Sequence, residues 1–129
     1  MQTILPAAKG IALCENHNGY PDGRVDLYSV FNAIHPRTGY PYSTQRISVF
    51  AQLVNGLGEV PFFVDVRHAE TEELVFTTNT YKLVFPSRSI VVQMAMRIEG
   101  CNFPLPGLYL FQLFCDNNWV CDTGLLLHE

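Results

Sequence analysis

Apolar and polar residues alternate along most of this chain, and helical spacing of apolar residues does not recur. Residues 46–55, RISVFAQLVN, place on one strand face Ile47, Val49, Ala51 and Leu53. Residues 60–68, VPFFVDVRH, repeat this pattern with Val60, Phe62, Val64 and Val66. The GLGE segment between the two runs supplies two glycines for a turn, so together they predict a β-hairpin. Pro61 favours an edge position or a strand end for the second run.

Three further regions continue the strand pattern. Residues 74–85, LVFTTNTYKLVF, predict a broken strand or two short strands, and part of 69–75 is open to a helical turn. Residues 89–99 give the cleanest alternation, with inward positions at Ile90, Val92, Met94, Met96 and Ile98. Near the N-terminus, KGIALCE predicts a first strand followed by a polar loop, NHNGYPDG.

The stretch GRVDLYSVFNAI, residues 23–34, carries apolar residues on both strand faces. Such two-sided apolarity is typical of a strand that is covered on both faces, or of one that contains a bulge near Ser29. We therefore predict that this stretch is a central structural strand.

Residues 107–127 predict a closing hairpin with two alternative registers. A two-residue loop at 117–118 shifts one strand by one position and would bury Asp122. A three-residue loop at 117–119 keeps the apolar residues on one face, and for that reason we predict it. One of its last two residues is then expected to adopt a strained turn conformation.

About 7–9 short, mostly antiparallel strands predict an all-β fold, namely a β-sandwich of immunoglobulin-like or C2-like type. The 129 residues fit a single domain, residues 1–129, with no linker and no internal repeat. An apolar content of 48% with 16% charged residues is typical of a globular chain.

Charge excludes some function classes. The net charge is −4 and the eight Lys and Arg residues are scattered singly, so no basic stripe is available for nucleic acid or for an anionic membrane surface. No segment approaches the roughly 20 apolar residues of a membrane helix. The N-terminal MQTILPAAKG lacks the features of a signal peptide, which favours a cytoplasmic location.

The four cysteines are interpreted first as buried thiols in a reducing compartment: Cys14, Cys101, Cys115 and Cys121. The alternative is a cross-strand disulfide, because the three-residue loop sets Cys115 opposite Cys121. Cys14-x-x-His17 supplies only half of a zinc site, so no metal and no other cofactor is predicted.

Several motifs occur in a recognisable order along the chain: Ala12-Leu13-Cys14-Glu15, then Gly23-Arg24-Val25 with Phe31 and Ile34, then Pro104, Pro106, Gly107, Tyr109, Phe111, Leu113 and Asp116. By these motifs the chain resembles, nearly end to end, a bacterial family of small proteins described only as a domain of unknown function. It departs from the pattern in Glu15, where Asp is usual, and in a longer NHNGYP insertion. The resemblance implies a bacterial, all-β, stand-alone domain and adds no mechanism.

Antiparallel strands send alternate loops to opposite ends of a domain. We expect loops 16–24, 55–59, 86–89 and 116–119 at one end, and loops 36–45, 69–73 and 99–107 at the other. The first end would present an aromatic platform with hydrogen-bonding neighbours for a sugar or peptide, namely Tyr20, Asp22, Trp119 and Asn16. The bland interpretation is that these residues only cap the core.

The second end carries aromatic residues on proline-stiffened loops, which lose little entropy on docking to a partner. The candidate partner-binding residues are His35, Arg37, Tyr40, Tyr42 and Phe103. They too are open to interpretation as simple end caps.

No nucleophile motif such as G-x-S-x-G and no phosphate-binding glycine loop occurs, so we expect no enzymatic activity. The first hypothesis is a non-catalytic protein-interaction or structural domain with an unknown protein partner, including a homodimer through a sheet edge. The second is small-ligand or carbohydrate binding through the loop aromatics. An enzyme is the third and weakest alternative.

Overall fold

The computed structural model describes residues 2–44 and 46–129, which form strands and turns with no helix. The nine longer strands are β1 (Ala7–Gly19), β2 (Val25–Val30), β5 (Arg46–Val54), β6 (Gly58–His68), β7 (Leu74–Thr77), β8 (Tyr81–Phe85), β9 (Val92–Glu99), β11 (Gly107–Cys115) and β12 (Asn118–Leu127). Three strands have two residues each: β3 (Ala33–Ile34), β4 (Tyr42–Ser43) and β10 (Asn102–Phe103). The all-β prediction is confirmed. The expected number of 7–9 strands accounts only for the longer strands, because a strand of two residues is too short to show alternation in the sequence.

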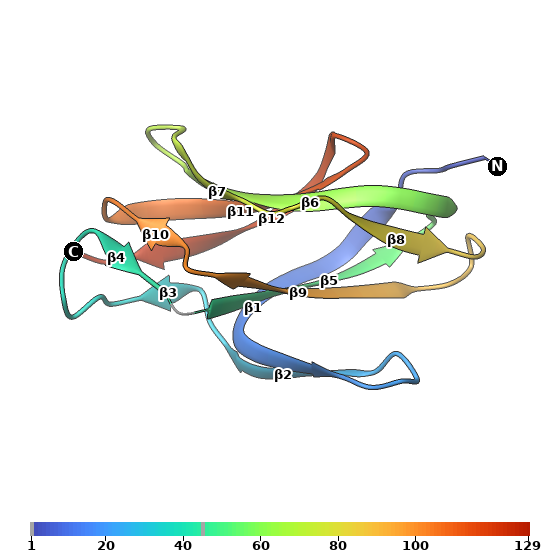
Figure 1. Cartoon of the computed structure of the whole chain (residues 1–129), viewed down its shortest axis with the longest axis horizontal. Coiled ribbons are helices and arrows are strands. Elements are labelled where there is room, and N and C mark those ends of the chain that lie inside the picture. The colour runs from blue at the N-terminus through green and yellow to red at the C-terminus, as the bar shows by residue number, and fades with distance from the viewer. Residues whose placement is uncertain (1, 45) are drawn as a thin grey trace.

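Two sheets lie as two layers (Figure 1). The four-stranded sheet has the order β2-β1-β5-β9, and the six-stranded sheet has the order β3-β12-β11-β6-β7, with β8 also paired to β6. Strands β10 and β4 form a separate two-stranded ribbon. All strand pairs in the described residues are antiparallel except β3 with β12, and no sheet closes on itself.

The core fills the space between the two layers because period-two alternation turns one side of each strand inward. The predicted inward residues of β5 and β6 are all buried, as are Tyr109, Phe111 and Leu113 of β11. On β9 the predicted face is confirmed from Val92 onward, whereas Ile90 precedes the strand and is exposed. The pattern therefore identified the inward face of these strands correctly.

The hairpin predicted for residues 46–68 is wrong. β5 pairs with β1 and β9, whereas β6 pairs with β11, β7 and β8, so the link at 55–57 crosses from one sheet to the other. Leu57 in this link exchanges both backbone hydrogen bonds with Ile4, at 3.0 and 3.1 Å. Pro61 lies within β6, beyond the end of its pairing with β11 and opposite Lys82 of β8.

The closing hairpin exists, but neither predicted loop is correct. The loop is Asp116-Asn117, with φ of 49° and 62°. A two-residue loop with two positive φ values matches the twist of paired strands, and Asp and Asn tolerate this conformation. An irregularity of one residue after Leu113 then keeps the apolar residues of the hairpin on the predicted inward face, with Leu113 opposite Cys121. Cys115 is opposite Asn118, so the direct Cys115–Cys121 pairing of the predicted register is not formed.

The stretch 23–34 is not a central strand. It forms β2 at the edge of the four-stranded sheet and then β3 in the other sheet. Tyr28 and Val30 are 48% and 62% exposed, so the two-sided apolarity reflects uncovered side chains. Ser29 has a φ of 56°, as a local irregularity predicts, yet the register of β2 against β1 is the same on both sides of it.

The remaining local predictions fare better. Residues 74–85 form two short strands, β7 and β8, as one alternative stated. The segment before them is a hydrogen-bonded turn, in which Glu72 N donates to His68 O, and no helix forms there. The polar loop after the first strand is shorter than predicted, because Asn16, His17 and Asn18 belong to β1.

Figure 1 confirms the sorting of loops along the long axis of the molecule. Links 20–24, 55–57, 86–91 and 116–117 lie toward the end that carries the N-terminus. Links 35–41, 69–73 and 100–106 lie toward the end that carries the C-terminus. Gln45 of the second predicted set lies outside the described residues.

Candidate functional site

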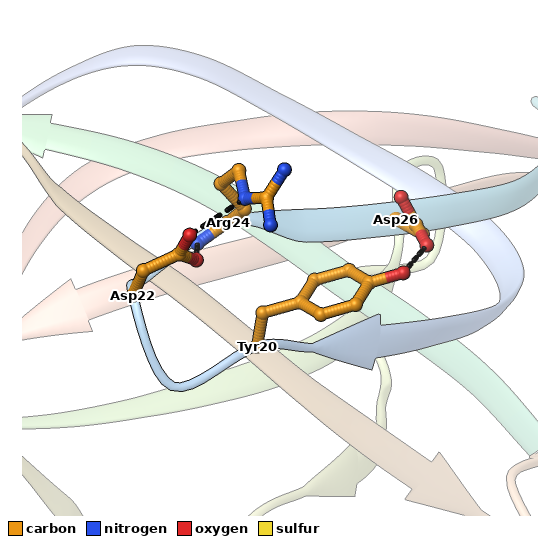
Figure 2. A network of polar contacts seen from close by, with 4 residues as sticks. All are labelled: Tyr20, Asp22, Arg24 and Asp26. Atoms are coloured by element: carbon orange, nitrogen blue, oxygen red, sulfur yellow. Dashed lines mark hydrogen bonds and ion pairs between the residues drawn. The ribbon is translucent and has the colours of Figure 1, made fainter.

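The turn between β1 and β2 is a closed network of polar contacts (Figure 2). Tyr20 donates its hydroxyl hydrogen to Asp26, and Arg24 Nε donates to Asp22 Oδ2 at 2.8 Å. The Arg24 guanidinium lies over the Tyr20 ring, 5.2 Å from its centroid. The hydrogen bond to Asp26 raises the pKa of Tyr20, because it stabilises the neutral phenol. The polar groups of this turn are thus satisfied within it, and one ring face is covered.

Trp119 does not join Tyr20 in a common platform. It lies at the start of β12 and is 56% exposed. In Figure 1 the β11–β12 turn and the β1–β2 turn project from opposite layers of the molecule. Trp119 is instead opposite Phe114, which stacks on Phe63 with ring centroids 5.0 Å apart. The four residues of the predicted sugar or peptide site are therefore divided between two separate surfaces.

The predicted partner-binding residues do share one end of the molecule, but two of them are occupied there. His35 stacks on His128 at 3.9 Å between ring centroids, and Tyr40 donates to the backbone oxygen of His128 at 2.6 Å. Arg37 is exposed. The prediction for Phe103 is wrong in its placement, because this side chain is fully buried against Tyr109 and presents nothing to a partner.

Tyr42, the fifth of these residues, lines a cleft of about 540 Å³ that the sequence did not reveal. The polar lining residues are Glu15, Thr44 and Arg46, and the others are Phe31, Ala33, Ile34, Tyr42 and Ile47. We call it the Thr44 cleft. The cleft lies where three parts of the chain meet β1, namely the segment around β3, the segment around β4 and the start of β5.

A second hollow, of about 360 Å³, lies between β8 and β9. Its lining consists of Phe62, Tyr81, Lys82, Leu83, Gln93, Met94, Ala95, Met96 and Arg97. We call it the β8–β9 groove. Met94 and Phe62 are core residues, so here the core reaches the surface between the two layers.

The structure also contains a serine–histidine pair that no sequence pattern predicted. Ser48 Oγ of β5 lies 2.8 Å from Nδ1 of His17, because the second half of β1 leaves β5 and pairs with β2. Burial, and then the charge of Arg97, lower the pKa of His17. Ser48 is fully buried, so its hydroxyl has no access to a substrate.

The lowered pKa of His17 predicts a specific dependence of stability on pH. In the unfolded chain His17 binds a proton near pH 6.5, whereas in the native protein it resists protonation. The contribution of neutral His17 to the free energy of unfolding is therefore complete above pH 6.5 and is lost as pH falls through the native pKa. The loss is at most about 1.4 kcal/mol per pH unit, the value for one proton. Urea unfolding of His17→Asn between pH 7 and about pH 5 should show this component removed.

Asn at position 17 retains a hydrogen-bonding group near Ser48 and does not titrate. The other histidines are present in both the wild type and the variant, so the difference between the two pH profiles reports on His17. A variant that followed the wild-type pH profile would show that His17 is not its source.

The four cysteines are free thiols, and three of them are buried while Cys121 is half-buried. Burial raises the pKa of Cys101 to about 12 and that of Cys115 to about 11, and also raises the pKa of Cys14 and of Cys121. Thiols with raised pKa values are protonated and react slowly.

Two further features bear on the class of site. No group of three His, Cys, Asp or Glu residues within 2–44 and 46–129 is placed to hold a metal ion. Across the same described ranges, no helix has the length and apolarity needed to span a bilayer.

Both hollows depend on residues brought together from distant parts of the sequence. The Thr44 cleft joins Glu15 to residues 31–47, and the β8–β9 groove joins Phe62 to residues 81–97. Strand alternation identified Phe62 and Met94 as core residues. Only the assignment of β8 and β9 to different sheets would have shown that these two residues form the floor of an open groove.

The comparisons with known proteins give a family and no activity. No curated protein matches the chain significantly. The model described as "Family of unknown function (DUF6941)" matches residues 9–127. That match covers β2 to β12 completely and all of β1 except its first two residues. The chain therefore belongs to this family of unknown function.

Proposed function

We propose that this chain is a non-catalytic protein-interaction domain that binds an extended segment of a partner in the β8–β9 groove. The observation that carries the proposal is the pair of free strand edges on either side of an apolar floor. β9 pairs only with β5, and β8 pairs only with β6, among the described residues. Edge strands present unpaired backbone N–H and C=O groups, and an added strand satisfies them.

The side chains of the groove suit an extended segment. Met94 and Phe62 form the floor, while Leu83 and Met96 are half-buried and leave apolar surface to cover. An extended segment presents every second side chain to such a floor. Figure 1 shows the loop that joins β8 to β9 at one end of the two strands.

The charges favour an acidic partner segment. The lining contains Lys82 and Arg97 and no carboxylate. Lys82 is only loosely paired with Glu59, at 3.5 Å between exposed groups, and such pairs contribute little. Arg97 donates to Asn16 Oδ1 and to the backbone oxygen of His17, neither of which is charged. An apolar segment with flanking Asp or Glu residues therefore complements the groove.

The test is a selection of peptides from a random library, followed by titration of the tightest binders. Adjacent residues of β8 provide matched variants, since Leu83 lines the groove, whereas Val84 is exposed and is not part of its lining. Leu83→Glu should weaken binding at least about tenfold, or 1.4 kcal/mol, by repelling the acidic residues and removing apolar contact. Val84→Glu should change it less than about twofold.

Peptide binding should also slow amide exchange in β9. Equal affinity for the two variants, or protection confined to another strand, would contradict the proposal. Sedimentation of the chain alone belongs to the same experiment: a dimer that the peptide dissociates would identify a second copy as the occupant.

Homodimerisation through a sheet edge is the second candidate, and exposed β2 at the other edge of the four-stranded sheet favours it. Absence of catalysis is part of the proposal, supported by the burial of Ser48 and the raised thiol pKa values. The two layers support a β-sandwich, while the immunoglobulin-like or C2-like type, the cytoplasmic location and the bacterial origin stay predictions.

A further inference from the structure

The β8–β9 groove is lined by the edges of two strands and not by their faces. A hollow over the face of a strand is lined by every second residue, because successive side chains point to opposite sides of the sheet. This groove is lined instead by consecutive residues, 93–97 of β9 and 81–83 of β8. The backbone of β9 therefore forms part of the wall, and an occupant meets its polar groups directly.

Hydrogen bonds elsewhere in the four-stranded sheet show which backbone groups of β9 point into the groove. The backbone N–H of Phe31 donates to Leu13 O at 3.0 Å, immediately beside the pair formed by Cys14 and Val30. In an antiparallel ladder, the residues of a pair flanked in this way direct their own N–H and C=O groups away from each other. The backbone groups of Cys14 thus point toward its partner in β5, Ser48.

The alternation continues from β5 into β9, and the register between these two strands has no shift. The next residue of β5, Val49, directs its backbone groups toward β9, where its partner is Met96. Residues of β9 at even positions therefore bond to β5, and those at odd positions direct their groups to the opposite edge. The groups at that edge belong to Gln93, Ala95 and Arg97. Among residues 2–44 and 46–129, no strand pairs with this edge.

The side chains of β9 determine what an added strand carries. Met94 is buried and Met96 is half-buried, both toward the inside of the sandwich, whereas Gln93 and Arg97 are exposed. Neighbouring strands share this alternation, so residues opposite the two methionines enter the groove above Phe62. A residue opposite Arg97 lies beside its guanidinium, where a carboxylate gains a charge-assisted hydrogen bond.

We propose that the partner segment joins the four-stranded sheet as a strand antiparallel to β9, and that it is recognised by the sequence acidic–apolar–x–apolar. This inference rests on the function proposed above and specifies its partner. The acidic residue is opposite Arg97, the two apolar residues are opposite Met96 and Met94, and x, any residue, is opposite Ala95. All strand pairs of the four-stranded sheet in the described residues are antiparallel, and the added strand continues that pattern.

Residue-resolved amide exchange tests the direction of the backbone groups. In the free chain, the amides of Gln93, Ala95 and Arg97 should exchange at least about tenfold faster than those of Met94 and Met96, because only the latter pair with β5. Saturation with a peptide from the library whose binding Leu83→Glu weakens should slow the three fast amides at least about tenfold. Slowing confined to the two methionines, or absent from all five residues, overturns the proposal.

N-methylation of that peptide tests the same pairing from the other side. At position x the methyl group removes an N–H that donates to β9, so binding should weaken at least about tenfold. At the apolar residue after x the N–H points away from β9, so the loss should stay below about threefold. Equal losses at the two positions overturn the proposal.

Replacing the acidic residue of the peptide by its amide should weaken binding to the wild type at least about threefold and leave binding to Arg97→Gln unchanged. A variant that still distinguished the two peptides would overturn the contact with Arg97. Peptides that depend on Leu83 but lack the motif overturn this inference and leave the proposed function standing. A library that yields no such peptide overturns the proposed function, and this inference with it.

Discussion

Gly107→Ala is expected to lower the free energy of unfolding by about 4 kcal/mol, the sum of backbone strain and steric overlap. Gly107 has a φ of 124°, a conformation that residues with a side chain rarely adopt. A Cβ atom there would lie 2.8 Å from Nε2 of His68. Urea or guanidinium unfolding monitored by circular dichroism measures the change.

His68 cannot move aside without losing its own hydrogen bonds. Its Nδ1 accepts from the backbone N–H groups of Glu70 and Thr71, both at 3.2 Å. The proton is therefore on Nε2, which donates to the backbone oxygen of Pro106 at 3.1 Å. The ring also packs edge-on against Tyr109. A displaced ring would break several of these part-buried hydrogen bonds, which is why relaxation cannot remove the whole cost.

Two other glycines separate the two causes. Gly100 has a φ of 69° with no atom within 4 Å of a built Cβ, so Gly100→Ala reports strain alone and should cost about 1 kcal/mol. Gly10 has neither feature, so Gly10→Ala should stay within about 0.5 kcal/mol of wild type. A loss in Gly107→Ala no larger than that in Gly100→Ala would refute the contact with His68.

Gly56→Ala should cost about 2 kcal/mol by overpacking the link between β5 and β6. An added Cβ would lie 2.7–2.8 Å from three ring atoms of Phe85, which is itself almost fully buried. In the hairpin that the sequence predicts, this glycine lies in an exposed turn, where an added Cβ meets no core side chain and the substitution would cost about 1 kcal/mol of backbone strain at most. The same unfolding measurement therefore distinguishes the crossing link from a hairpin.

A double-mutant cycle with Phe85→Leu makes the test specific. The smaller side chain should cost about 1 kcal/mol by itself and should relieve part of the overlap. The double variant is then expected to lose at least about 0.5 kcal/mol less than the sum of the single losses. Strict additivity would show that Gly56 and Phe85 do not meet.

The candidate site was less predictable than the strands, for a reason visible in Tyr20 and Phe103. Residue type made both of them candidates for binding. Yet Arg24 covers one face of Tyr20, and Tyr109 buries Phe103. Whether an aromatic side chain is free depends on which neighbours the folded chain brings into contact with it, and residue type does not reveal them. Ala95 shows the converse, because an alanine gives no sequence signal that its backbone groups lie at a free strand edge.

Strand alternation by itself determined which side chains of β5, β6, β9 and β11 face inward, because the pleat sends successive residues to opposite sides whatever the partner strand is. The sheet to which each strand belongs was decided only by the tertiary structure. A short link such as 55–57 permits in-plane pairing or a crossing between layers, and long-range pairing with β1, β9 and β11 selects the crossing. The same long-range pairing leaves β8 and β9 as free edges, from which the proposed interaction surface arises.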